Sequence, residues 1–244
     1  MKLYLLYCGK LDLPSKQGNI TPLPGEDGPI SVPCWAYLVE HEKGLVLIDC
    51  GQHNTAVAKV REEDRIVNRL AELGYTPDDV KFVVLTHMHI DHAADMELFP
   101  NSTFVVRREE LRQAWWPDVC DFLYKYDDYK NTRNFRYCQL EPEETFDLFM
   151  DGTIRLIDTM GHTSGHQSVL LKLPNTGDVA ICGDAGALKE SLDRLSPAPT
   201  CPNKRKAIHS LVKLRHLRDI GFQMIYSHDT QQEKELKRSP EYYD

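Results

Sequence analysis

Potential metal ligands crowd one short stretch of the chain. The run from Thr86 to His92 reads T-H-M-H-I-D-H and follows a short apolar segment. Histidine nitrogen and carboxylate oxygen are the donors that zinc prefers, and a loop at the end of a strand can turn such side chains towards a common point. His87 and His89 can share one ion, while Asp91 and His92 can face a second. The spacing therefore predicts a site for two metals.

Three more candidates lie far downstream, each in a turn of small residues after an apolar segment. They are His162, Asp184 and His228. A single histidine after a strand is more often an ordinary hydrogen-bonded polar residue than a ligand. Strand ends converge in α/β sheets, however, so distant residues can meet there. Together with the first stretch, these three would complete two ligand shells.

Regular elements must bring these segments together, and hydrophobic patterns predict where they lie. A helix is predicted over Glu62–Leu73, ended by Gly74, and another over Ala207–Ile220, ended by Gly221. A hairpin is also predicted, in which the turn at 42–44 joins the strand at 35–39 to the strand at 45–49. This hairpin ends at Asp49. Strands are predicted at 2–7, 35–39, 45–49, 82–85, 103–107, 154–158, 168–173, 179–182 and 222–226.

Two segments lack a clear period. Residues 18–33 are rich in glycine and proline and are predicted to form a surface loop. Residues 115–137 are rich in aromatic and charged side chains. They could form a lid or pocket wall, or equally an irregular helical surface segment. The alternation of strands and helices predicts an α/β or α+β class, with residues 1–244 as one domain.

Composition narrows the classes of function. The net charge of −8 opposes the basic surface that nucleic acid requires. The opening apolar stretch is too short for a signal segment or a membrane span, so neither export nor a membrane partner is predicted. The seven cysteines include no C-x-x-C pair, which favours reduced thiols and a cytoplasmic protein.

Competing chemistries lack their signatures. There is no G-x-S-x-G elbow and no cysteine in a persuasive catalytic setting. Glycine-rich nucleotide-binding loops are also missing from the sequence. A water activated by metal is the nucleophile that these residues predict.

The set of ligands resembles that of the metallo-β-lactamase superfamily and, within it, the acyl-homoserine lactonase group. The stretches that carry the second resemblance are 63–68, 74–79, 161–168, 227–229 and 232–234. The resemblance implies a four-layer αββα sandwich with the metals at one edge of the two sheets. It also implies two zinc ions per chain, although iron, cobalt or manganese could replace them.

Carried over position by position, the resemblance assigns three groups of ligands. It places His87, His89 and His162 on one zinc, places Asp91, His92 and His228 on the other, and makes Asp184 the bridge. Asp49 is similar to a residue that orients a ligand histidine, although a plain turn residue is an open alternative. His166 would support the site without being a ligand, and His41, His53, His209 and His216 would lie on the surface.

The implied reaction is opening of a lactone ring. Hydroxide bridging the metals would attack the carbonyl carbon, one zinc would polarise the carbonyl oxygen, and the other would accept the leaving alkoxide. Asp91 would take and return a proton. The expected substrate is an N-acyl homoserine lactone, as in quorum quenching, and the protein would be a monomer or homodimer.

One departure from the lactonase pattern concerns the substrate. The group has a tyrosine three residues after the bridging aspartate, whereas this chain has Ala187. Tyr226 precedes His228 by two positions and could supply the missing hydroxyl if both lie on one strand face. The open alternatives are a different, possibly aromatic, lactone or a small ester, a glyoxalase-type thioester substrate, or a silent metal-binding protein.

Overall fold

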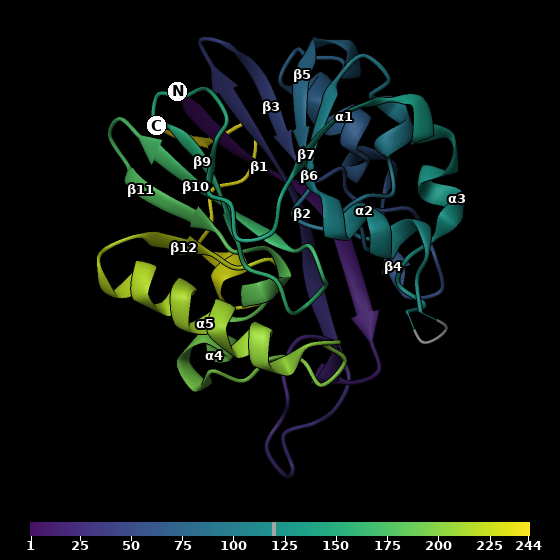
Figure 1. The fold of residues 1–244 in the computed structure, drawn as a ribbon, viewed down its shortest axis with the longest axis vertical. Coiled ribbons are helices and arrows are strands. Elements are labelled where there is room, and N and C mark those ends of the chain that lie inside the picture. The colour runs from purple at the N-terminus through teal and green to yellow at the C-terminus, as the bar shows by residue number, and fades with distance from the viewer. Residues whose placement is uncertain (119–120) are drawn as a thin grey trace.

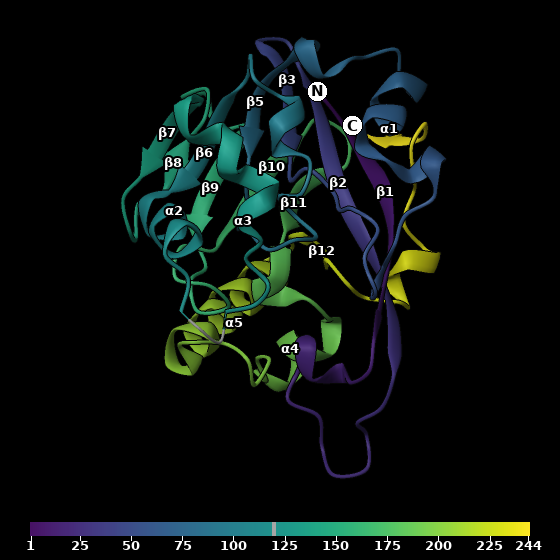
Figure 2. The same ribbon diagram turned by 90° about the vertical axis from the view of Figure 1, so that its right-hand side faces the viewer.

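Two β-sheets pack face to face, and each carries helices on its outer side (Figure 1). The computed structural model describes residues 1–118 and 121–244. Turning the molecule by 90° brings the side that carries the helices at 108–115 and 126–129 towards the viewer (Figure 2). The arrangement of helix, sheet, sheet and helix is the αββα sandwich that the sequence resemblance implied.

The larger sheet contains most of the first half of the chain. Its order is β13-β1-β2-β3-β5-β6-β7, with β4 paired to β1. From β3 to β7 neighbouring strands are parallel, so their carboxyl ends meet at one edge. The bounds are β1 Lys2–Leu13, β2 Ile30–His41, β3 Gly44–Ile48, β4 Ala58–Lys59, β5 Val80–Val84, β6 Thr103–Arg107, β7 Arg136–Leu140 and β13 Tyr242–Tyr243.

The smaller sheet has the order β12-β11-β10-β9-β8. Strands β9 and β11 are both antiparallel to β10, and β12 is parallel to β11. The carboxyl ends of β9, β11 and β12 therefore share one edge. The bounds are β8 Phe146–Asp147, β9 Ile154–Asp158, β10 Gln167–Leu173, β11 Gly177–Ile181 and β12 Gln223–Ile225.

Side-chain alternation along the strands divides the core into layers. Leu5, Val39, Leu156 and Ile181 belong to the buried cluster between the sheets. The larger sheet's other face packs on α1 Ile66–Glu72, α2 Arg108–Trp115 and α3 Tyr126–Tyr129. The smaller sheet's other face packs on α4 Lys189–Arg194 and α5 Lys204–Asp219. Short 3-10 turns lie at 16–18, 62–64, 77–79, 96–98, 130–134, 183–186 and 232–234.

Most predicted elements are present, and two predictions were wrong in part. The strands at 103–107 and 154–158 have the predicted bounds. The helix predicted from Glu62 begins only at Ile66, because Arg65 is extended and a 3-10 turn precedes it. The segment predicted as loop at 18–33 ends earlier, since β2 starts at Ile30 and pairs with β1.

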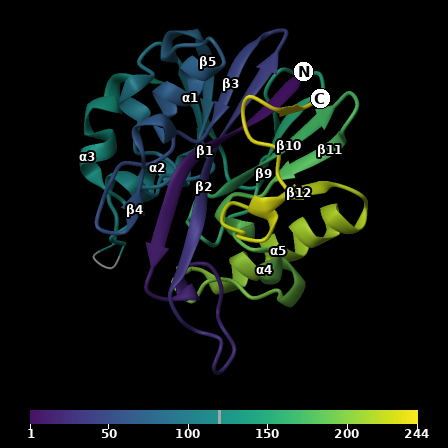
Figure 3. The same ribbon diagram turned by 180° about the vertical axis from the view of Figure 1, so that it is seen from behind.

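The chain ends lie side by side at one end of the molecule (Figure 3), where β1 pairs with β13. No helix in the described ranges is long and apolar enough to cross a membrane. Six cysteines are free of disulfide bonds in the described residues, namely Cys8, Cys34, Cys50, Cys138, Cys182 and Cys201. Residues 119–120 of the predicted segment 115–137, which include Cys120, lie outside the described residues.

Candidate metal centre

Strand ends from both sheets deliver the predicted ligands to one place. The loop after β5 carries His87, His89, Asp91 and His92. The smaller sheet contributes residues that follow β9, β11 and β12, namely His162, Asp184 and His228. These are the edges at which parallel strands end, so residues distant in sequence meet between the two sheets.

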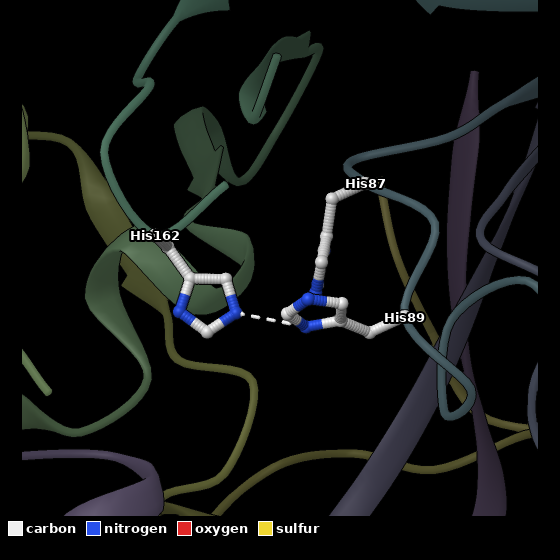
Figure 4. A group of neighbouring side chains, drawn as sticks. All are labelled: His87, His89 and His162. Atoms are coloured by element: carbon white, nitrogen blue, oxygen red, sulfur yellow. Dashed lines mark hydrogen bonds between the residues drawn. The ribbon is translucent and has the colours of Figure 1, made fainter. Parts of the chain in front are cut away.

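The first set consists of His87, His89 and His162, all buried. One ring nitrogen from each residue lies within 4.8 Å of the others. Nε2 of His162 is 3.2 Å from Nδ1 of His89. In Figure 4 the His162 ring approaches from one side, and His87 and His89 approach from the loop opposite.

The second set consists of Asp91, His92, Asp184 and His228, with one ligand atom from each again within 4.8 Å of the others. Oδ2 of Asp91 is 3.4 Å from Nε2 of His92 and 3.4 Å from Nε2 of His228. The atoms therefore surround a common centre, as donors around a single ion do.

Asp184 lies between the two sets. Its Oδ1 is 3.2 Å from Nε2 of both His92 and His228. Its Oδ2 is 3.4 Å from Nε2 of His162 and 3.9 Å from Nε2 of His87. One carboxylate oxygen thus faces each set, which is the geometry of the predicted bridge.

Outer hydrogen bonds aim two ligand rings at the centre. Nδ1 of His92 lies 2.8 Å from Oδ2 of Asp49, and Nδ1 of His228 lies 2.8 Å from the carbonyl oxygen of Pro33. The backbone amide and hydroxyl of Thr86 also donate to Asp49, at 2.7 and 2.8 Å. Such contacts fix the tautomer and orientation of a ligand ring. The location of Asp49 agrees with the orienting role that the sequence predicted.

Burial makes the first set neutral. It lowers the pKa of His89 to about 3 and lowers the pKa of His87 and His162 from the ordinary value. In the second set burial also lowers the histidine pKa, but the negative charges of Asp184 and Asp91 outweigh this effect. They raise the pKa of His92 and His228 well above the usual value.

The donors fit divalent metal. Among the residues of the two described ranges, Nε2 of His87 is a buried ring nitrogen without a hydrogen-bond partner. A buried ring nitrogen that lacks a partner costs free energy, and a bound cation removes that cost. Imidazoles and carboxylates at these separations form the donor set that zinc prefers.

The position of Tyr226 argues against its predicted catalytic role. Its ring packs with Ala180, Leu192 and Leu211 between the smaller sheet and its helices. Strand β12 ends at Ile225, so strand alternation does not continue to His228. Tyr226 instead lines a cavity of about 770 Å³ beside α4 and β12.

Segment 115–137 contacts the metal-bearing loop after β5 at one point. The ring of Tyr124 packs edge-on against His89, with centroids 4.8 Å apart. The amide of Ile90 donates to the carbonyl oxygen of Leu123 at 3.1 Å. Trp116 and Phe122 are exposed. The segment therefore packs against the loop after β5 at residues 123–124, while Tyr129 and Thr132 are buried and Trp116 and Phe122 lie on the surface.

Sequence reasoning missed two residues close to the sets. Glu110 of α2 is fully buried and hydrogen-bonded to both metal-bearing segments. Sγ of Cys34 lies 3.9 Å from Oδ2 of Asp91. Neither residue belongs to a spaced motif, so no local signal marks them.

The remaining histidines largely follow prediction. Nδ1 of His166 contacts the Thr159 hydroxyl at 2.9 Å, and its Nε2 accepts a hydrogen bond from the amide of Ala185 at 3.2 Å, which fits the predicted supporting role. His41 was predicted on the surface, and this was wrong. It is buried and stacks on Phe149 with centroids 4.3 Å apart.

Comparisons with known proteins point the same way as the geometry. Residues 30–221 match the model of the metallo-beta-lactamase superfamily. The chain is 30% identical to the N-acyl homoserine lactonase AttM of Azorhizobium caulinodans, covering 100% of this chain and 99% of that protein. It is also 30% identical to the N-acyl homoserine lactonase AiiA of Bacillus thuringiensis subsp. kurstaki, over 99% and 98%.

A solved structure extends this similarity to the fold. The structure is of an N-acyl homoserine lactone hydrolase with N-hexanoyl-L-homoserine bound at its catalytic metal centre. It is similar to this chain with a TM-score of 0.88 at 27% identity, covering 99% of this chain and 98% of that one.

Proposed function

The chain belongs to the metallo-beta-lactamase superfamily and is a metal-dependent hydrolase, and on that premise we propose that it opens the ring of N-acyl homoserine lactones. One observation carries the proposal. Two complete sets of buried ligands share Asp184 in a chain that is similar over its full length to N-acyl homoserine lactonases.

The proposed ligands follow the two sets. His87, His89 and His162 would hold one zinc ion, Asp91, His92 and His228 would hold the other, and Asp184 would bridge them. Iron, cobalt or manganese could occupy the same donors. When bound, two such ions supply an activated water and a Lewis acid for a carbonyl oxygen.

Asp91 is the residue proposed to move a proton. Its side chain is almost fully buried, with 9% of its surface exposed. His92 and His228 hold Oδ2 of Asp91 at 3.4 Å from each Nε2. In the proposed role, the carboxylate takes a proton from the attacking water and returns it to the ring oxygen that leaves.

The substrate could differ from that of the relatives. Ala187 stands where the lactonase group has tyrosine, and only 2% of Ala187 is exposed. No hydroxyl is therefore contributed from this position. The alternative substrate is a different lactone or a small ester. The enzyme would prefer such a substrate to homoserine lactones because Ala187 replaces the tyrosine. A cytoplasmic location and a monomeric or dimeric state remain predictions.

The test is a panel of zinc-loaded hydrolysis assays. Short- and long-chain acyl-homoserine lactones are compared with aromatic and aliphatic lactones, a thioester and a chelated control. Fast opening of homoserine lactones only with metal supports the proposal. Turnover of another lactone alone would replace the substrate, and no turnover by protein holding both metals would leave a silent metal-binding protein.

Asp91→Asn tests the proton role in the same assays. We expect turnover to fall by about 100-fold or more, since positioned proton transfer contributes about that factor. Metal content must be measured with it, because Asp91 also belongs to the second set. Asp12→Asn, on the exposed side of β1, removes the same charge as a control. Full turnover with full metal content would exclude the role.

A further inference from the structure

A buried carboxylate outside both sets connects the segments that carry them. Glu110 of α2 has no exposed surface. A buried charge is costly unless hydrogen bonds compensate it, so its partners define why it is there. Its hydrogen-bond partners lie in the two loops that carry the first-set ligands and in segment 115–137.

Each oxygen of Glu110 accepts two hydrogen bonds. Oε1 accepts the amide of Met88 at 2.8 Å and the hydroxyl of Tyr124 at 2.8 Å. Oε2 accepts the hydroxyl of Thr163 at 2.6 Å and the amide of Gly165 at 3.1 Å. The carboxylate is therefore matched to four donors, which only an ionised acid can satisfy fully.

The partners adjoin the first set specifically. Met88 stands between His87 and His89, and Thr163 directly follows His162. Tyr124, while donating to Glu110, packs its ring on His89. One carboxylate thus joins the loop after β5 to the loop after β9, and these two loops supply all three ligands of that set.

Backbone packing shows how closely these parts fit. A Cβ atom built on Gly165 would lie 2.2 Å from the backbone nitrogen of Glu110. The loop after β9 therefore touches the backbone of α2, and small shifts of the helix would be passed to His162. Rigid contact of this kind is what a precise ligand geometry needs.

We propose that Glu110 is a positioning residue that sets the separation of His87 and His89 from His162 and thereby the affinity of the first metal site. The inference rests on the metal centre of the proposed function. Glu110 would contact neither the metal nor the substrate. It would act on the ligands through the loop backbone and through Tyr124.

The decisive variant is Glu110→Gln. The amide keeps the size of the side chain but replaces one acceptor oxygen with an NH₂ group that would face two donors. We expect the affinity of the first site for zinc to fall by about 10- to 100-fold, as for other outer partners of ligands. Affinity at the second site should stay near the unmodified value.

Competitive chelator titration with zinc, and cobalt absorption spectra, measure the two sites without turnover. His162→Ala and His228→Ala identify which step belongs to which set. Asp64→Asn is the matched control, because Asp64 is also a buried carboxylate, but its partners are Arg61 and Arg69. It should lower the melting temperature and leave both metal affinities unchanged.

Glu110→Gln that binds both metals with unchanged affinity would overturn the inference, even if it melts earlier. If Glu110→Gln fails to fold, Tyr124→Phe and Thr163→Val each remove one of the four bonds. At least one must weaken the first site, or the inference is wrong. Unmodified protein that binds no metal pair would instead refute the metal centre, and a fully loaded but inactive protein would refute only the proposed reaction.

Discussion

Asp49 adopts a left-handed backbone conformation, with φ of 59°, directly after β3. Non-glycine residues in this region store strain that surrounding contacts must offset. Here the contacts are the Thr86 amide and the His92 ring. The left-handed residue is thus held by hydrogen bonds to a ligand of the second set and to the residue before the ligand loop.

Asp49→Asn should weaken zinc binding at the second site by about 10- to 100-fold, because an amide holds the His92 ring less firmly than a carboxylate does. Chelator competition measures the loss. Asp12→Asn, at an exposed position, should leave the affinity unchanged. Equal affinities in both variants would show that Asp49 is a turn residue only.

Ala187→Tyr should fail to restore a lactonase-type hydroxyl. The alanine side chain is almost fully buried, and its carbonyl oxygen accepts the amide of His228 at 2.9 Å. A large ring would overpack this position and lower the free energy of unfolding by about 1–3 kcal/mol. Denaturant unfolding and lactone kinetics measure both effects, with Ala187→Ser as the small control. Faster turnover at unchanged stability would contradict this.

Metal binding should release protons mainly from the second set. The first-set histidines are already neutral near pH 7, since burial lowers their pKa. Burial also opposes charge on His92 and His228, but Asp184 and Asp91 raise their pKa, so both keep protons that zinc must displace. Falling pH should therefore empty the second site first. Calorimetry in buffers of different ionisation enthalpy tests this, and equal release from both sites would refute it.

Sequence alone could indicate the ligands because they cluster at His87–His92 and follow apolar strands. It could not indicate Glu110, because a carboxylate on a helix carries no mark of burial until the loops around it are placed. Tyr226 shows the opposite error. Strand alternation suggested a shared face with His228, but the strand ends at Ile225 before the alternation reaches the ligand.

At the scale of elements, glycines decide how closely loops approach helices. Gly161 has φ of +130°, and a Cβ there would lie 2.1 Å from the backbone nitrogen of Ala207 in α5. His162 follows immediately, so this close contact with α5 fixes the position of the His162 backbone. Periodicity predicted α5 itself but not this contact.

Gly161→Ala should lower stability by about 1–3 kcal/mol through overpacking and should also weaken the first metal site. Gly177→Ala is the control, since Gly177 has φ of +88° but no atom within 4 Å of the added carbon. It should cost about 1–2 kcal/mol from backbone strain and leave metal binding intact. Thermal unfolding and zinc titration separate the two effects. Similar metal affinity in both variants would mean that α5 yields without moving His162.

The break in the helix predicted from Glu62 has a comparable cause. Extended Arg65 separates the 3-10 turn from α1, and this lets Asp64 turn inward to Arg61 and Arg69. The apolar spacing of the segment indicates one helical face, but it does not indicate the ion pairs of Asp64 with Arg61 and Arg69. Local pattern therefore placed the helix and misplaced its start.

For the whole molecule, the metal ligands join two sheets that otherwise meet through apolar packing. His87, His89, Asp91 and His92 belong to the larger sheet, while His162, Asp184 and His228 belong to the smaller. The αββα order was predictable from resemblance and strand alternation. The pairing of strands and the contacts across the sheets required the structure, because they depend on residues far apart in the chain.

Removal of metal should therefore destabilise the whole fold. An ion present at about 100 times its dissociation constant contributes about 2.7 kcal/mol per site. For a chain of this size, that corresponds to a fall in melting temperature on the order of 10 °C per site. Calorimetric scans with and without chelator measure the shift, and reloading with zinc should reverse it. An unchanged melting temperature would show that the sheets hold together without the ions.

The distribution of ligands along the chain also orders events during synthesis. The first set is complete once residue 162 has been made, whereas the second waits for His228, beyond helix α5. A nascent chain of this length already contains the three donors of the first set, together with Asp91 and His92, while Asp184 and His228 are still unmade. Metal capture at the second site marks the moment at which the last strand joins the smaller sheet.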